Sequence, residues 1–222
     1  MKTTAILPVK RLGSAHNRLA GALEPEERLR LAEAMFLDTL HKLPWCKTID
    51  DVIVVTADDA VARQATWLGH QVLLEDEDHG HPEAAEAGAR AAMDRGVERV
   101  VMLPVDCPLL EPSELDAHLG RSPRTALIVP DAEGTGTNAL VLNPPDAFHP
   151  AFGPDSCARH VGRARAGGIS FALERIESLA TDLDDRRDMA ELRDALLLNP
   201  EPAKRTATVL WELGAKAEHA AA

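Results

Sequence analysis

The sequence predicts an α/β fold, a three-layer α/β/α sandwich with a mainly parallel mixed sheet. Short apolar runs alternate with helical patterns over the first 110 residues, which implies right-handed crossovers between parallel strands. The run Arg99–Leu103 is apolar without alternation, as expected for a strand covered on both faces. Beyond residue 122 glycine and proline interrupt the strands, which favours loops and some antiparallel pairing. We expect one domain over residues 1–200, then a C-terminal helix and a frayed tail over 201–222.

The expected strands are the short apolar runs bounded by polar, glycine or proline residues. Each is about the length of an ordinary strand. In chain order they are Thr4–Val9, Asp51–Thr56, Gln71–Leu74, Arg99–Leu103, Ala126–Val129, Asn138–Leu142 and Ile169–Ala172.

The expected helices follow from apolar residues that recur every three or four positions. The first covers Glu26–Leu43, with Pro25 as a first-turn residue. The helix over Pro82–Gly96 ends at a glycine. The others are Asp58–Leu68, a helix that begins near Ser156, Asp185–Leu198 and Arg205–Ala215.

Composition excludes several classes of partner. The chain has 24 Lys and Arg residues against 36 Asp and Glu residues, for a net charge of −12, which argues against nucleic acid. It has no apolar run of 18 residues and no signal-like N-terminus, so we expect neither membrane insertion nor export, and a cytoplasmic location. Cys46, Cys107 and Cys157 form no C-x-x-C pair. Reduced thiols that pack in the core are expected, with Cys157 as a nucleophile the alternative.

The segment Leu103-Pro-Val-Asp-Cys-Pro-Leu-Leu110 is the most informative in the chain. It places Asp106 where an apolar strand stops, and open α/β sheets bind ligands at such strand ends. A carboxylate there is unfavourable unless a cation or hydrogen-bond donors meet it. The segment therefore indicates a metal site, although an aspartate that only caps the following turn remains an alternative.

A second acidic cluster, Thr181-Asp-Leu-Asp184, supports the metal hypothesis. On an extended segment, Asp182 and Asp184 point to the same side. Mg²⁺ is a hard cation that one or two carboxylates hold together with water and substrate phosphates. The alternative is that Asp184 and Asp185 cap the helix that begins near Arg186.

The first strand ends in a basic loop that contains Lys10, Arg11 and Arg18. Cations beside free backbone N–H groups can hold a triphosphate, although G-x-x-x-x-G-K-[ST] is absent. A solvated loop is the alternative. The segment Glu75–His81 is rich in acids and histidine, but a polar loop explains it as well as a metal site does. At the end of this segment, Gly80 followed by Pro82 and Glu83 opens a helix where a base or ribose could bind.

Two later segments predict anion binding. Asp131–Leu140 has small residues and hydroxyls before a strand, which lets backbone approach an anion. Phe152–His160 places Gly153 and Ser156 ahead of a helix whose N-terminal amides attract phosphate or carboxylate. A hairpin turn and a plain N-cap are the respective alternatives.

These motifs in this order resemble one family, the 2-phospho-L-lactate/phosphoenolpyruvate guanylyltransferases of coenzyme F-420 biosynthesis. That family is related to molybdenum-cofactor guanylyltransferases and sugar-nucleotide transferases, so the resemblance implies a nucleotide-diphospho-sugar transferase-like (Rossmann-like) fold. The similarity runs from Ile6 to about Met189. Its elements are Pro-Val-Lys10 with Arg18-Leu19, Pro104-x-Asp106-x-Pro-Leu109, Gly136-Thr-Asn-Ala-Leu140, Phe152-Gly-x-x-Ser156 with His160, and Asp182-x-Asp184.

The resemblance implies GTP and a small phosphorylated three-carbon acid as substrates, with pyrophosphate released, and is compatible with a homodimer. The acid would be phosphoenolpyruvate, 2-phospho-L-lactate or 3-phosphoglycerate. It also implies roles for individual residues. Mg²⁺ would be held by Asp106, Asp182 and Asp184, and catalysis would use Lys10, Arg18 and Asp106. The nucleotide would contact Leu7, Pro8, Val9, Lys10, Arg18, Gly80, Glu83 and Pro104; the acceptor would contact Thr137, Asn138, Gly153, Ser156 and His160.

The sequence departs from the family pattern at two places on the nucleotide side. It has His16-Asn17 where relatives usually carry a lysine and a Ser or Thr, and Gly80-His-Pro-Glu-Ala-Ala85 where they usually carry Gly-Leu-Asn-Ala-Ala. The preference for guanine is therefore open. Another base or acceptor, a metal-dependent glycosyltransferase, and a nucleotide-binding protein without catalysis are the alternatives.

Overall fold

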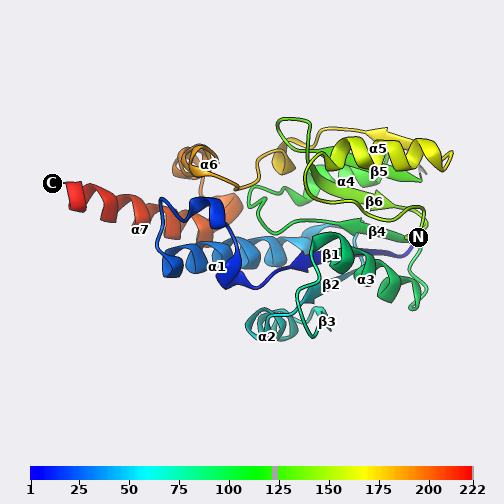
Figure 1. Cartoon of the computed structure of the whole chain (residues 1–222), viewed down its shortest axis with the longest axis horizontal. Coiled ribbons are helices and arrows are strands. Elements are labelled where there is room, and N and C mark those ends of the chain that lie inside the picture. Colours follow the sequence, from blue (N-terminus) through cyan, green and yellow to red (C-terminus); the bar gives the residue numbers. More distant parts are fainter. Residues whose placement is uncertain (122–124, 222) are drawn as a thin grey trace.

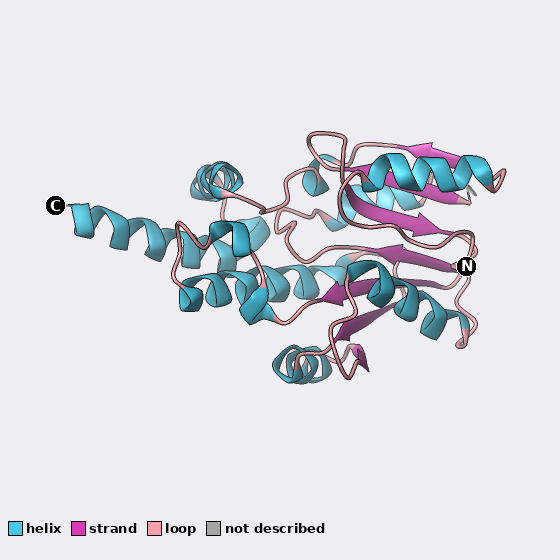
Figure 2. Ribbon diagram, in the orientation of Figure 1, coloured by secondary structure: helices cyan, strands magenta, loops and turns pink. Residues whose placement is uncertain are grey.

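The structure, a computed structural model, describes residues 1–121 and 125–221. Seven of the described segments form one sheet (Figures 1 and 2). Its strands lie in the order β3-β2-β1-β4-β6-β5-β7. In chain order they are β1 (Thr3–Val9), β2 (Asp51–Thr56), β3 (Gln71–Leu74), β4 (Arg99–Met102), β5 (Ala126–Pro130), β6 (Thr137–Leu142) and β7 (Phe171–Leu173).

Strand direction decides which loops meet. β1 pairs in parallel with β2 and β4, β2 with β3, and β5 with β7, whereas β6 is antiparallel to both β4 and β5. The carboxyl ends of the six parallel strands therefore share one edge of the sheet, together with the first residue of β6. The predicted mainly parallel sheet and all seven predicted strands are confirmed, with ends within two residues of expectation.

Helices cover both faces of the sheet, which confirms the three-layer sandwich. α3 (His81–Met93) and α5 (Ser156–Ala166) pack on one face and lie in front of the sheet in Figure 1. α1 (Pro25–Lys42), α2 (Asp59–Trp67) and α4 (Pro112–Leu119) pack on the other. α3 lies so close to the sheet that a methyl group at Gly88 would collide with Ile6 and Val55.

A third core lies beyond the sheet, where α6 (Arg186–Leu198) and α7 (Lys204–Ala221) pack with α1. In Figure 1 α6 is seen end-on, and α7 extends away from the sheet towards the C-terminus. Asp38 of α1 is buried and accepts hydrogen bonds from the backbone N–H and hydroxyl of Thr206, both at 2.9 Å. α7 continues through Ala221, six residues beyond the predicted helix end at Ala215; Ala222 lies outside the described residues.

Local sequence explains most helix starts. Asp58 caps α2 by accepting from the N–H groups of Ala60 and Val61, and Asp185 caps α6 in the same way. The eight-residue α4 was not predicted, because so short an element shows little periodicity. Short 3₁₀ turns complete the chain at Leu12–Ser14, Asn17–Leu19, Leu43–Trp45, Glu177–Leu179 and Glu201–Ala203. Among the described residues, no helix combines the length and the hydropathy that a membrane crossing requires.

Candidate active site

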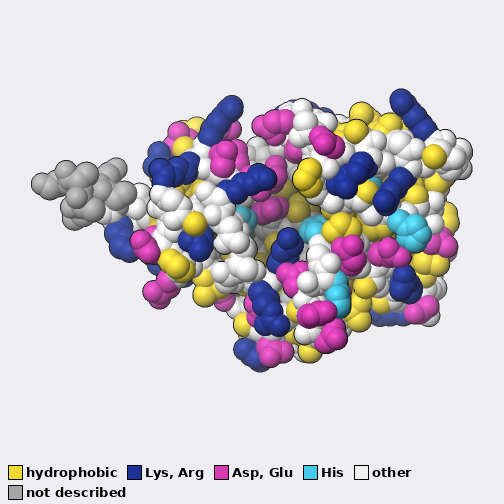
Figure 3. Space-filling model, viewed as in Figure 1, with side chains coloured by type: hydrophobic (Ala, Val, Ile, Leu, Met, Phe, Trp, Pro, Cys, Tyr) yellow, Lys and Arg dark blue, Asp and Glu magenta, His cyan; other side chains and the backbone are white. Residues whose placement is uncertain are grey.

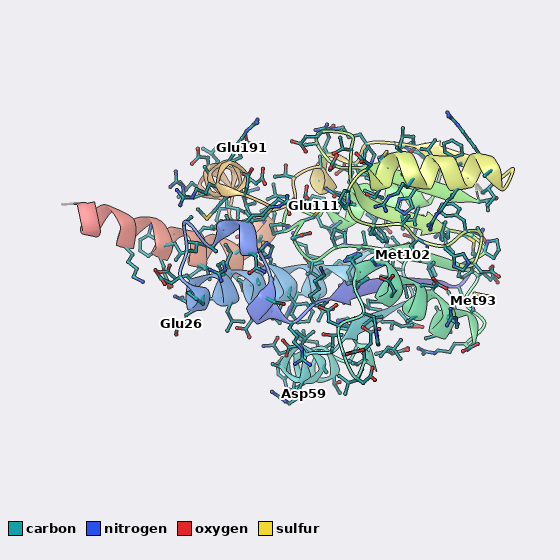
Figure 4. All side chains as sticks on the ribbon, in the orientation of Figure 1. Glu26, Asp59, Met93, Met102, Glu111 and Glu191 are labelled. Atoms are coloured by element: carbon teal, nitrogen blue, oxygen red, sulfur yellow. The ribbon has the colours of Figure 1, made fainter. Side chains whose placement is uncertain are left out.

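The predicted site residues gather at the edge of the sheet where the parallel strands end. Lys10 follows β1, Thr137 opens β6, and Asp106 lies in the loop between β4 and α4. In Figure 4 the labels Met102 and Glu111 mark the two ends of that loop. The segment with Asp182 and Asp184 returns to the same edge after β7.

Three hydrogen bonds fix the loop that carries Asp106. Its carbonyl accepts from the N–H of Leu183 at 3.1 Å. The Cys107 thiol donates to the carbonyl of Leu179 at 3.6 Å, and the Lys42 ammonium donates to the carbonyl of Pro108 at 2.6 Å. The first of these bonds directly joins the two acidic motifs that the sequence separates by more than seventy residues.

The carboxylates of the two motifs destabilise one another. Burial, then the charges of Asp182 and Asp184, raise the pKa of Asp106 to about 7. Burial also raises the pKa of Asp182, which the Asn138 amide opposes by donating to its Oδ1 at 3.1 Å. Carboxylates with raised pKa values are common at functional sites, and a bound cation would reduce the repulsion between them.

Asp184 and its neighbour Asp185 have different roles. The Asp184 carboxylate accepts from the Arg18 guanidinium at 2.6 Å, in an ion pair with both side chains more than half exposed. Asp185 accepts from the N–H groups of Arg187 and Asp188 at the start of α6. The capping alternative therefore holds for Asp185, while Asp184 links the acidic segment to the basic loop after β1.

The donor chemistry of this cluster fits Mg²⁺. Asp106, Asp182 and Asp184 offer carboxylate oxygens, and burial followed by the charges of the other two raises the pKa of Asp106. In residues 1–121 and 125–221, no three His, Cys, Asp or Glu side chains stand close enough to hold one ion together. Magnesium sites in which one or two carboxylates act with water and phosphate oxygens do not require such a cluster.

The loop after β1 closes over the acidic segment through His16. This residue has a left-handed backbone with φ of 51°. Its Nδ1 donates to the carbonyl of Leu183 at 2.9 Å, and burial lowers its pKa. One of the two departures from the family pattern is therefore a structural contact between the loop and the Asp182–Asp184 segment.

A hollow on the nucleotide side lies between the end of β1 and the start of α3. Its lining includes Lys10 and His81. Burial, and then the positive charge of Lys10, lowers the pKa of His81 to about 4. Figure 3 shows a hollow on this face with acidic, basic and histidine side chains at its rim. The lining residues of the hollow at the start of α3 are Pro8, Val9, Lys10, Ala57, Glu75, Asp78, Gly80, His81 and Ala84.

The structure separates the predicted nucleotide residues into groups. Pro8, Val9, Lys10 and Gly80 line the hollow, whereas the Leu7 side chain is fully buried in the core. Of the others, Arg18 pairs with Asp184, Pro104 follows β4, and Glu83 lies in the first turn of α3. Glu75 and Asp78 also line the hollow, and they were not among the predicted nucleotide residues. Their position directly after β3, at the ligand edge, was the signal in the sequence.

On the acceptor side, a bulge near the start of β6 aims two neighbouring side chains at different partners. Pro130 pairs with Thr137 and Val129 with Ala139, which leaves Asn138 as an extra residue. Asn138 donates to the carbonyl of Leu179 at 2.7 Å, on the side of the acidic segment. Thr137 contacts Nδ1 of His160 on α5 at 3.0 Å.

The loop before β6 and the start of α5 form one unit. The N–H of Cys157 donates to the carbonyl of Thr135 at 3.1 Å, and the N–H of Ser156 donates to that of Gly153. Gly153 has φ of 106°, which favours glycine. The segment before Thr137 is thus joined to the start of α5, where Gly153 and Ser156 lie. Cys157 is buried and burial raises its pKa, which fits a packing thiol rather than a nucleophile.

One aromatic contact series joins the predicted nucleotide and acceptor sides. The Phe152 ring meets His81 edge-on at 4.7 Å and His160 at 5.2 Å between centroids. Chemically, the edge of the sheet therefore offers carboxylates for a cation, a lysine for a phosphate, and hydroxyl and amide groups for a second anion. This combination suits the transfer of a phosphoryl-containing group between two anionic molecules.

Comparison of this chain with known proteins identifies its family. The family model described as "Guanylyl transferase CofC like" matches residues 3–202. A phosphoenolpyruvate guanylyltransferase of Conexibacter woesei is 42% identical over 217 residues, which is 96% of this chain and 97% of that protein. A 2-phospho-L-lactate guanylyltransferase of Methanothermobacter thermautotrophicus is 33% identical, over 86% of this chain and 84% of that protein.

The fold has relatives among solved structures. A structure described as a nucleotide-diphospho-sugar transferase from Desulfovibrio desulfuricans G20 superposes with a TM-score of 0.78 at 18% identity. The match covers 97% of this chain and 96% of that one. At this identity the likeness concerns the fold alone, and it confirms the predicted nucleotide-diphospho-sugar transferase-like architecture.

Proposed function

The chain belongs to the family of CofC-like guanylyl transferases, and we propose that it transfers the guanylyl group of GTP to the phosphate of phosphoenolpyruvate or 2-phospho-L-lactate. Pyrophosphate is the other product, and the step belongs to coenzyme F-420 biosynthesis. One observation of the fold carries the assignment of the site. The sheet brings the acidic segments, the hollow beside Lys10 and the Thr137–Ser156 region to a single edge.

In this reaction an oxygen of the acceptor phosphate attacks the α-phosphorus of GTP in line, and the bond to pyrophosphate breaks. The attacking phosphate is already ionised near pH 7, so no strong general base is required. The protein must instead bring two anions together, orient them and offset the charge on the leaving group. Lys10, exposed and without a hydrogen bond or ion pair among the described residues, would meet the triphosphate.

Mg²⁺ would be held by one or two of the carboxylates of Asp106, Asp182 and Asp184 together with water and phosphate oxygens, and it would supply positive charge to the reacting phosphates. Arg18 would then exchange its exposed pair with Asp184 for a phosphate oxygen, because exposed ion pairs contribute little to stability. His16 and the N–H of Leu183 would keep the two loops together during this exchange.

The hollow at the start of α3 would take the base. Guanine carries N–H donors at N1 and at its 2-amino group, and the carboxylates of Glu75 and Asp78 are acceptors that line this hollow. Thr137, Gly153 and Ser156 would bind the phosphorylated acid at the start of α5, where backbone amides favour anions.

The experiment that tests the function is pyrophosphate release with Mg²⁺, measured for the four nucleoside triphosphates against phosphoenolpyruvate, 2-phospho-L-lactate and 3-phosphoglycerate. We expect release with GTP and with one of the first two acids. Release with another nucleotide alone would overturn the base assignment, and no release from any pair would overturn the proposed reaction.

A further inference from the structure

His160 is completely buried on α5 and uses both of its ring nitrogens. The N–H of Ala151 lies 2.8 Å from Nε2, and the hydroxyl of Thr137 lies 3.0 Å from Nδ1. The Phe152 ring packs edge-on against the imidazole at 5.2 Å between centroids. A histidine held in this way cannot rotate without losing contacts on every side.

These partners determine the tautomer. A backbone N–H can only donate, so Nε2 must accept and carries no proton. The neutral ring therefore carries its proton on Nδ1, and Nδ1 donates to the Thr137 hydroxyl oxygen. Burial, followed by the nearby Arg163 and Arg159, lowers the pKa of His160 to about 4, so this neutral form is maintained near pH 7.

The hydrogen bond has a consequence for Thr137. Because its oxygen accepts from His160, its own hydroxyl proton is left to donate elsewhere. Thr137 stands at the start of β6, at the edge where the strands of the sheet end. Ser156 lies four residues before His160 and so on the same face of α5. The free proton is therefore available on the acceptor side of the site.

We propose that His160 is a positioning residue that holds the Thr137 hydroxyl as a hydrogen-bond donor to an oxyanion of the acceptor, either its carboxylate or its phosphate. His160 itself does not touch the acceptor. A hydroxyl fixed in this way favours a ligand atom that only accepts, which is the chemistry of a phosphorylated carboxylic acid. The inference rests on the proposed function, because it names how the acceptor site of that reaction is built.

Two substitutions separate the two hydrogen bonds of the ring. His160→Asn places an amide near the position of Nδ1, where it can still donate to Thr137. His160→Gln places its amide near the position of Nε2, where it can accept from Ala151 but does not reach Thr137. Both remove the imidazole and leave a polar side chain, so each is the control for the other.

We expect His160→Gln to raise the KM for the acceptor about 10- to 100-fold, as loss of a hydrogen bond to a charged group does. His160→Asn should stay within about threefold of wild type, and the KM for GTP should not change in either variant. Thr137→Val should match His160→Gln, and combining the two should add no further loss. An acceptor KM raised equally in the Asn and Gln variants, or raised only in Asn, would overturn the proposal.

A second measurement needs no substitution at all. Nitrogen-15 spectra of the imidazoles in the wild-type protein should show His160 with its proton on Nδ1, and a proton on Nε2 would overturn the inference even if a variant failed to fold. Wild-type protein that releases no pyrophosphate with either acid would instead contradict the proposed function. The two failures are therefore distinguishable.

Discussion

Individual residues of the site are held in states that are unfavourable for the protein alone. Asp106 is placed by three hydrogen bonds of its loop beside two other carboxylates, and its pKa is raised to about 7. Asp185, directly after Asp184 of the metal hypothesis, makes favourable capping bonds instead. The adjacent residues Asp184 and Asp185 therefore have different roles, and their hydrogen-bond partners distinguish them.

Asp106→Asn should reduce turnover by at least about 1000-fold, because it removes a carboxylate from the site that offsets transition-state charge. Its melting temperature should equal or exceed that of wild type, since the substitution also removes like-charge repulsion. Asp185→Asn is the matched control, because asparagine also caps helices, and it should keep wild-type turnover. Pyrophosphate release and thermal unfolding measure both effects; full activity of Asp106→Asn would eliminate its role.

Glu75→Gln should lower kcat/KM for GTP about tenfold or more and weaken the preference for GTP over ATP. The amide that replaces the carboxylate is a poorer acceptor for the donors of guanine, and loss of one such contact weakens base discrimination. Glu77→Gln is the control, because Glu77 lies two positions further on and its side chain is exposed. Competition between the two nucleotides measures the ratio. Equal ratios in both variants would contradict base recognition by Glu75.

At the scale of elements, close packing of α3 and α7 positions the site. α3 begins at the nucleotide hollow and lies on the sheet through Gly88, which leaves no space for a side chain. α7 is attached to α1 by the buried carboxylate of Asp38, which accepts from Thr206 and Arg205. The position of α3 therefore depends on Gly88, and the position of α7 depends on the buried Asp38.

Gly88→Ala should lower the free energy of unfolding by about 1–3 kcal/mol, since the added methyl group collides with Ile6 and Val55. Gly162→Ala on α5 is the matched control, because nothing lies near an added methyl group there. It should stabilise the protein by about 0.5–1 kcal/mol. Denaturant unfolding compares the two variants, and a stabilised Gly88→Ala protein would show that α3 lies further from the sheet.

Asp38→Ala should cost about 2–4 kcal/mol of stability, because it leaves the buried polar groups of Thr206 without an acceptor. Glu212→Ala provides the comparison at the same helix pair. Its ion pair with Arg30 is about half exposed, so its loss should change stability by less than about 1 kcal/mol. If urea unfolding ranks these two variants in the opposite order, Asp38 does not hold α7 in place.

For the whole molecule, buried neutral histidines link stability to pH. The folded-state pKa of His160 is about 4, against 6.5 for an ordinary histidine. Between these two values the unfolded chain binds the proton and the folded chain does not. The contribution of this pKa difference to the free energy of unfolding is therefore fully present above pH 6.5 and is lost as the pH falls towards 4.

Over that interval we expect His160 to contribute a loss of up to about 3 kcal/mol in the free energy of unfolding. His160→Asn should flatten the decline, because the titrating group is gone. His149→Asn, which changes an exposed histidine, should leave the decline as in wild type. Unfolding measured from pH 4 to 7 compares the slopes, and an unchanged slope in His160→Asn would show that other groups account for the loss.

The sequence by itself determined the strands, most helices and the acidic, basic and glycine-containing motifs, because periodicity, caps and strand ends are local properties. It also determined the family, since five motifs in a fixed order are specific. Only the tertiary structure decided that β6 is the one antiparallel strand of the described sheet, that Arg18 pairs with Asp184, and that the His160 ring contacts the Thr137 hydroxyl. The physical reason is distance along the chain: Arg18 and Asp184 are 166 residues apart, and such contacts exist only once the sheet has formed.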